Sequence, residues 1–194
     1  MNEISVVIPS IPVRPGMLAQ AVTSVKDQTL LPHEIIVEMD EDREGAAATR
    51  QRGLQKVTTP WVAFLDDDDA FLERHLRSLL DHALEQEADY VYSWYNVING
   101  TDPMPQFFGL PWDNEQPHQT TITTLVRTEI AQEVGFRQGS MEDPNGGGIE
   151  VGGEDYVFTL GCMELGAKIH HLADRTWNWY HHGNNTSGLP SNWG

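Results

Sequence analysis

The sequence has only one cysteine, Cys162, among 194 residues. One cysteine cannot form an intramolecular disulfide or a cysteine-ligated metal site, so neither is expected, and a reducing compartment fits best. The sequence also lacks an apolar run long enough to cross a bilayer, and residues 1–9 lack the basic start and apolar length of a signal peptide. These absences predict a cytoplasmic protein without a membrane span.

Positive charge is scarce. The sequence has 12 Lys and Arg against 29 Asp and Glu, which gives a formal net charge of −17. The electric field around a protein of this charge repels phosphate backbones and anionic membranes, so nucleic acid is not expected as a partner. It would repel a nucleotide diphosphate as well, and any nucleotide site therefore needs a local arginine or a divalent cation.

In the first half of the chain, short β-branched segments alternate with segments of helical periodicity. The pattern predicts strands at 3–9, 34–39 and 61–65, and helices at 17–25, 46–56 and 71–85. This alternation indicates βαβ units and an α/β fold, with a Rossmann-like, mostly parallel central sheet and helices on both faces. Residues 1–97 are accordingly predicted to form the nucleotide-binding half of a single domain, 1–194.

The regularity weakens in the second half, 98–194. A strand at 90–97 precedes a segment at 100–119 that is rich in Pro, Gly, Asn and aromatic residues, which is typical of a long functional loop. The glycine-rich segment 138–153 is predicted to be a mobile lid. The remaining predicted elements are strands at 121–126, 168–172 and 177–182, and helices at 128–134 and 154–165.

Four consecutive aspartates, Asp66 to Asp69, follow the predicted strand 61–65 directly. The carboxyl ends of strands are where open parallel sheets bind ligands, and adjacent carboxylates repel one another unless a cation or protons neutralise them. The run therefore predicts a divalent metal site. The alternative is that Asp69 caps the helix at Phe71 while its neighbours are solvated. One cap needs one aspartate, which favours the metal.

The chain resembles the inverting family 2 glycosyltransferases, which have the GT-A fold. The resemblance covers nearly the whole chain and depends on the order and spacing of nine short motifs. They are SVVIPS (5–10), AVTSVKDQ (21–28), EIIV (34–37), ATRQRG (48–53), FLDDDD (64–69), LVR (125–127), GF (135–136), GEDY (153–156) and HGNNTS (182–187). The resemblance implies transfer of a sugar from a nucleotide-sugar donor, most commonly a UDP-sugar, to a glycan, protein or small-molecule acceptor.

The resemblance also implies roles for single residues. FLDDDD matches the family's DxD motif, with Asp68 and His182 expected to hold Mn²⁺ or Mg²⁺ on the donor diphosphate. Asp155 of GEDY matches the general base. The expected donor-binding residues are Pro9, Ser10, Asp40, Arg50, Asp66 and Asp67, and the possible acceptor contacts are Trp112, Asp113, His118 and Glu154.

Asp40 stands at a departure from the family pattern. The segment after the second strand reads EMDED, where the family usually has a pair of aspartates followed by Gly-Ser. Asp40 is the candidate for recognition of the nucleotide base. The alignment of this segment with the family motif does not fix a single register, so the identity of the nucleotide stays open.

Two other predicted roles have alternatives in the residues themselves. A carboxylate in a water-poor pocket can accept the proton of an acceptor hydroxyl, yet Asp155 could instead cap the helix that follows Gly153. Neighbouring histidines on a strand face opposite ways, so only one of His181 and His182 is expected to point into the site.

The alternative functions are a nucleotidyltransferase and a non-enzymatic, calcium-dependent carbohydrate-binding module. The first loop, 10–16, is too poor in glycine to cradle a triphosphate comfortably, which disfavours the former. The sequence leaves the donor sugar, the acceptor and the oligomeric state open.

Overall fold

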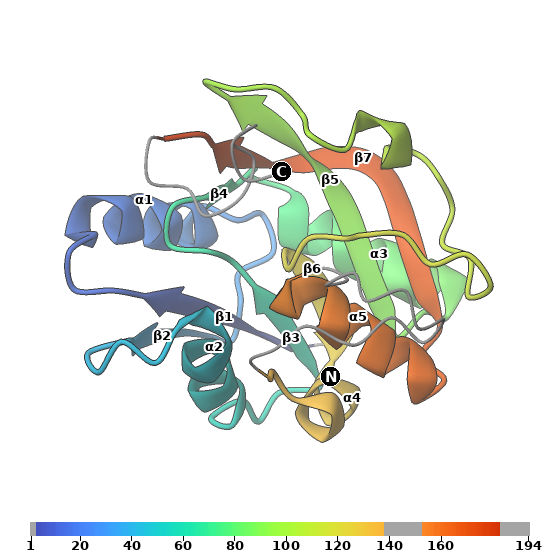
Figure 1. The fold of residues 1–194 in the computed structure, drawn as a ribbon, viewed down its shortest axis with the longest axis horizontal. Helices are drawn as coiled ribbons and strands as arrows, with labels where there is room; N and C mark the ends of the chain where they lie inside the picture. The colour runs from blue at the N-terminus through green and yellow to red at the C-terminus, as the bar shows by residue number, and fades with distance from the viewer. Residues whose placement is uncertain (1–2, 138–152, 183–194) are drawn as a thin grey trace, which may run out of the picture.

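A single seven-stranded sheet joins both halves of the chain in the computed structural model, which describes residues 3–137 and 153–182 (Figure 1). The strand order is β2-β1-β3-β6-β5-β7-β4. The elements are β1 (Ile4–Ser10), α1 (Pro15–Lys26), β2 (Glu34–Met39), α2 (Ala46–Leu54), β3 (Trp61–Phe64), β4 (Ala70–Phe71), α3 (His75–Gln86), β5 (Tyr90–Ile98), η1 (Pro105–Phe107), β6 (Thr124–Arg127), α4 (Thr128–Val134), α5 (Glu154–Glu164) and β7 (Ile169–Tyr180).

The sheet is mostly parallel, as the sequence predicts. Strands β2, β1 and β3 are parallel neighbours, and β5 and β7 pair in parallel. Strand β6 is antiparallel to both β3 and β5, so β5 and β7 run in the same direction as β3. Only β6 and β4 run the other way among the described strands. Every residue of β1 is buried, as expected for a central strand covered on both faces.

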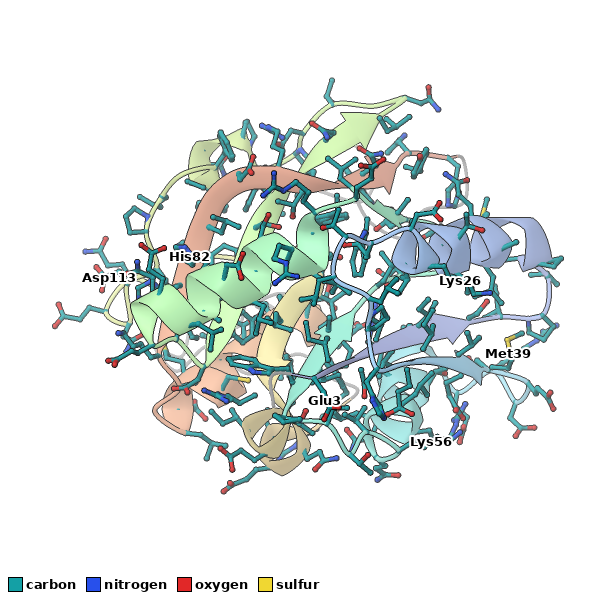
Figure 2. The ribbon with its side chains drawn as sticks, turned by 180° about the vertical axis from the view of Figure 1, so that it is seen from behind. Glu3, Lys26, Met39, Lys56, His82 and Asp113 are labelled. Atoms are coloured by element: carbon teal, nitrogen blue, oxygen red, sulfur yellow. The ribbon has the colours of Figure 1, made fainter. Side chains whose placement is uncertain are left out.

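Helices cover both faces of the sheet. Figures 1 and 2, seen from opposite sides, show α1 and α3 on one face and α2, α4 and α5 on the other. The buried stripe of α3, Leu76, Leu79, Leu80 and Ala83, follows helical spacing toward the sheet. Cys162 is buried in α5, and burial raises the pKa of its thiol to about 12. No helix in residues 3–137 and 153–182 is long and apolar enough to span a bilayer.

Four predicted elements differ in the structure. Helix α3 begins at His75, because Ala70 and Phe71 instead form β4 and pair with β7. The strands predicted at 168–172 and 177–182 are one strand, β7, which follows β5 along its whole length and shifts register near Trp94. The strand predicted at 121–126 begins at Thr124. The lid predicted at 138–153 lies, except for Gly153, outside the described residues.

Candidate functional site

The four aspartates follow β3 at its carboxyl end, and their side chains are held differently. Asp67 and Asp69 are buried, whereas Asp66 and Asp68 are partly exposed. Asp67 Oδ2 accepts a hydrogen bond from Ser10 Oγ at the end of β1 (2.6 Å). Asp69 Oδ1 accepts one from the backbone N–H of Tyr180 at the end of β7 (3.1 Å). Asp69 therefore does not cap α3, whose N-cap residue is Arg74.

The acidic run fits a divalent cation. One carboxylate oxygen each of Asp66, Asp68 and Asp69 lies within 4.8 Å of the others, and oxygen ligands suit Mg²⁺ and Mn²⁺. Burial, followed by the charge of Asp66, raises the pKa of Asp68 and that of Asp69. A cation would relieve this repulsion. His182 Nε2 lies 3.0 Å from Asp68 Oδ2, so the structure brings together the two predicted metal-holding residues.

Arg50 on α2 connects the acidic run to α5. Its side chain is only 4% exposed. The guanidinium donates from Nη2 to Asp66 and from Nη1 to Glu154 (2.8 Å), and Nη1 lies 3.5 Å from Asp155 Oδ1. Burial lowers the pKa of Arg50, but the charges of Asp66, Asp155 and Glu154 outweigh burial, and the net shift is upward. Arg50 is therefore a fixed positive charge between three carboxylates.

Asp155 lies in the first turn of α5, but its carboxylate does not cap that helix. The N-cap residue is Gly153, which is extended, and no side chain makes the cap hydrogen bond. Asp155 Oδ1 has no hydrogen-bond donor within the described parts of the chain. Burial raises the pKa of Asp155 to about 7, assisted by Asp66 and Glu154 and opposed by Arg50. A carboxyl group with this pKa can exchange a proton near neutral pH, as a general base must.

Asp40 and Pro9 lie at the carboxyl ends of β2 and β1. The Asp40 carboxylate accepts hydrogen bonds from the backbone N–H groups of Glu44 (2.8 Å) and Gly45 (2.9 Å). Burial alone would raise the pKa of Asp40, but these hydrogen bonds together with the charge of Arg52 and the Arg43 backbone N–H outweigh it, and the net shift is downward. In the structure Asp40 thus shapes the loop before α2, and its recognition of the base stays a prediction.

Two of the possible acceptor contacts in the long loop, Trp112 and His118, belong to an aromatic cluster against β5. His118 is buried, with Nε2 2.9 Å from the Tyr92 hydroxyl, and its ring stacks on Phe107. The indole N–H of Trp112 donates to Asn114 Oδ1. Asp113 is exposed, and Figure 2 shows it at the opposite edge of the molecule from Lys26 on α1. Packing accounts for His118, and the acceptor roles stay predictions.

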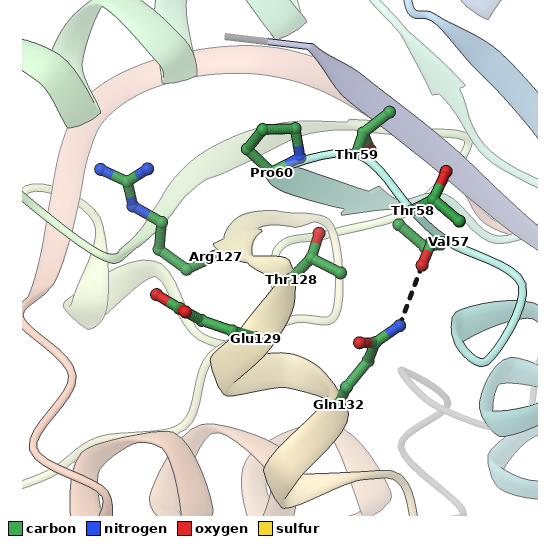
Figure 3. A pocket seen from close by; sticks show the side chains of 8 residues that line it. All are labelled: Val57, Thr58, Thr59, Pro60, Arg127, Thr128, Glu129 and Gln132. Atoms are coloured by element: carbon green, nitrogen blue, oxygen red, sulfur yellow. Dashed lines mark hydrogen bonds between the residues drawn. The ribbon is translucent and has the colours of Figure 1, made fainter. Parts of the chain in front are cut away.

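A cavity of about 320 Å³ lies at the other end of β3 (Figure 3). Gln132 of α4 closes one side, with its amide donating to the carbonyls of Leu54 and Val57. The cavity adjoins residues 57–60, which precede β3, whereas the acidic run follows the opposite end of that strand. The cavity is therefore separate from the candidate site. Its lining residues are Val57, Thr58, Thr59, Pro60, Arg127, Thr128, Glu129 and Gln132.

Arg14 is a site residue that the sequence analysis does not predict. It precedes α1, and its Nη1 lies 3.0 Å from both Asp67 Oδ1 and Asp68 Oδ2. Burial lowers the pKa of Arg14, but its carboxylate partners outweigh burial and the net shift is upward. One feature of the sequence could have pointed to Arg14: it is an arginine in the loop after the first strand, in a chain with only 12 Lys and Arg.

Two known proteins are similar to this chain in sequence. The succinoglycan biosynthesis protein ExoW of Rhizobium meliloti (strain 1021) is 29% identical over 197 residues, which cover 87% of this chain and 56% of ExoW. The putative teichuronic acid biosynthesis glycosyltransferase TuaG of Bacillus subtilis (strain 168) is 30% identical over 73 residues, 37% of this chain and 29% of TuaG. The chain thus spans about half the length of ExoW and less than a third of TuaG.

The fold is shared with solved structures. The crystal structure of S. aureus TarS 1–349 superposes with a TM-score of 0.74 at 16% identity, covering 92% of this chain and 60% of that one. The same TarS fragment in complex with UDP-GlcNAc gives a TM-score of 0.76 at 15% identity, with 94% and 60% covered. This similarity confirms the GT-A fold. Residues 36–142, more than half of the chain, match the family model described as Glycosyl transferase family 2, and the chain belongs to this family.

Proposed function

We propose that the protein is a metal-dependent inverting glycosyltransferase that moves a sugar from a UDP-sugar to an acceptor hydroxyl. Family membership favours a glycosyltransferase over a nucleotidyltransferase or a calcium-dependent carbohydrate-binding module. The UDP-GlcNAc bound to TarS supports a UDP-sugar donor. The observation that carries the proposal is the position of Arg50, which holds Asp155 beside the acidic run.

On the donor side, Asp66, Asp68, Asp69 and His182 would hold Mn²⁺ or Mg²⁺. Such an ion, when bound, supplies positive charge against the negative charge that develops on the leaving diphosphate. Ser10 orients Asp67 and Arg50 orients Asp66, so the carboxylates are preorganised.

The nucleotide is expected at the carboxyl ends of β1 and β2, beside Pro9, Ser10 and Asp40, because ligands of open sheets bind at this edge. We assign residues 1–97 to donor binding and 98–194 to the acceptor and to catalysis.

On the acceptor side, Asp155 would take the hydroxyl proton as the acceptor oxygen attacks the sugar carbon. The bond from that carbon to the diphosphate oxygen breaks on the opposite face, so one displacement inverts the configuration. Asp155 Oδ1 is buried, but the side chain as a whole is 33% exposed, which leaves it within reach of an acceptor. Glu154, held by the same arginine, is expected at the acceptor, together with Trp112, Asp113 and His118.

The test is UDP release from a panel of UDP-sugars, with Mn²⁺ and with EDTA, and NMR of the released sugar to assign its anomeric configuration. Asp155→Asn is expected to slow release by about 10²- to 10⁴-fold, the usual contribution of a general base, while calorimetry finds unchanged UDP binding. Asp68→Asn is expected to weaken Mn²⁺-dependent UDP binding.

A matched control is Asp81→Asn on α3, whose side chain is 61% exposed, and this variant should behave as wild type. Release that EDTA does not affect would contradict the metal dependence. Full activity of Asp155→Asn would contradict the base, and a retained configuration would contradict the single displacement.

A further inference from the structure

Arg14 contacts Asp68, one of the carboxylates that a donor-bound metal would need. Its backbone is fixed at the start of α1, where its N–H donates to the Ile11 carbonyl and its own carbonyl accepts from Leu18. One side-chain nitrogen, Nη1, bridges Asp67 and Asp68 at 3.0 Å each. The oxygen of Asp68 that it contacts, Oδ2, is the one that faces His182. Arg14 thus supplies a resident positive charge at this corner of the acidic run.

This charge opposes a metal at the same corner. Asp68 is one of the three aspartates whose oxygens converge within 4.8 Å. A divalent cation on Asp68 would lie within about 5 Å of the Arg14 guanidinium if Arg14 stayed in place, and two positive charges at that distance repel each other. A metal alone therefore has to displace Arg14 or bind against its charge.

A donor diphosphate removes the conflict between Arg14 and a metal, because its negative charge attracts both cations. Two arginines form ion pairs with the acidic run in the described parts of the chain, Arg14 and Arg50. Arg50 is 4% exposed and both of its terminal nitrogens face carboxylates, so it cannot turn to a ligand. Arg14 is 23% exposed, and only Nη1 is engaged with the run.

We propose that Arg14 is an exchangeable counter-ion, which neutralises Asp67 and Asp68 in the absence of donor and turns to the donor diphosphate when a metal takes Asp68. The proposal rests on the proposed function. It makes the binding of metal and of nucleotide mutually reinforcing, because each ligand removes the obstacle to the other. Coupling of this kind must be equal in both directions.

The experiment measures binding to the full chain. Free Mn²⁺ is followed by electron paramagnetic resonance without nucleotide, and UDP binding by calorimetry at saturating Mn²⁺. Arg14→Met is expected to bind Mn²⁺ alone about tenfold more tightly and UDP with Mn²⁺ about tenfold more weakly, a change typical of coupled sites. Arg14→Gln repeats the neutral substitution with a polar side chain, and Arg14→Lys, which keeps the charge, should bind Mn²⁺ alone as wild type does.

Arg77→Met on α3 is the matched control, because Arg77 pairs with Asp81 at 3.9 Å and not with the acidic run. This variant is expected to leave both affinities unchanged. The proposal is overturned if the neutral Arg14 variants bind Mn²⁺ no more tightly than wild type, or if they keep wild-type affinity for UDP. Those results would leave the proposed function standing. A wild-type protein that binds neither Mn²⁺ nor UDP would reject both.

Discussion

Lowering the pH below 7 should slow transfer because Asp155 would then be protonated. Burial raises the pKa of Asp155 to about 7, against an ordinary value of 3.8. With a pKa of about 7, about a tenth of the carboxyl groups are ionised at pH 6 and about a hundredth at pH 5. The rate should therefore fall about tenfold per pH unit on the acid side. An aspartate with an ordinary pKa would keep the rate flat to about pH 5.

A bound cation changes this value in a known direction. The charge of Asp66 contributes to the raised pKa of Asp155, and a cation on Asp66 would offset that contribution. Burial, the largest cause, stays. The acid limb should therefore lie at or below about pH 7 and above the ordinary aspartate value.

The assay is kcat/KM for UDP release at saturating metal from pH 5.5 to 8.5, with UDP affinity measured at each pH to separate donor binding from chemistry. Arg50 lowers the pKa of Asp155, so Arg50→Gln should move the acid limb to higher pH. Melting temperatures verify that each variant folds. An acid limb that persists in Asp155→Asn, or one that Arg50→Gln does not move to higher pH, would refute the reasoning.

Two predictions concern stability. His75 is fully buried, and burial lowers its pKa to about 3. Because the folded protein holds this histidine neutral, its contribution to the free energy of unfolding is fully present above the unfolded pKa of 6.5 and is lost as the pH falls toward 3. Between pH 6.5 and 4.5 it should remove about 2.5 kcal/mol from the free energy of unfolding. Denaturant melts should show a shallower pH dependence in His75→Gln but not in the exposed control His33→Gln, and equal slopes would contradict the prediction. In α2, a Cβ on Gly53 would lie 2.5 Å from Val7 Cγ1, so Gly53→Ala should cost about 1–3 kcal/mol in the same melts. Gly16→Ala, which meets nothing within 4 Å, should cost nothing, and equal melts for both would refute the clash.

The βαβ half of the fold could be predicted because its information is local. Strands β1, β2 and β3 are short apolar runs, and α1 and α2 lie between them at helical periodicity. Errors arose where a distant partner decided the structure. Ala70 and Phe71 would suit the start of a helix, but pairing with Asn178 and Trp177 makes them a strand. The gap predicted at 173–176 coincides with a shift of register against β5, and β7 stays one strand because Arg175 and the residues from Trp177 onward pair with β5 again.

The candidate site divides in the same way. The acidic run could be located from its place after β3, and Asp68 and His182 do meet. The inclusion of Asp69 in the convergent set depended on α3 starting at His75 instead of Phe71. Arg14 could not be assigned from its neighbours, because its carboxylate partners lie 53 and 54 residues further along the chain.

By itself, the sequence determined the alternation of elements, the excess of negative charge and the presence of four carboxylates at the end of a strand, since each depends on residues adjacent in the chain or on composition. Only the tertiary structure decided that Arg50 faces Glu154, 104 residues away, and that Arg14 shares a carboxylate with His182. The physical reason is that helix packing against the sheet sets which way a side chain points, and burial at the resulting contact sets its charge.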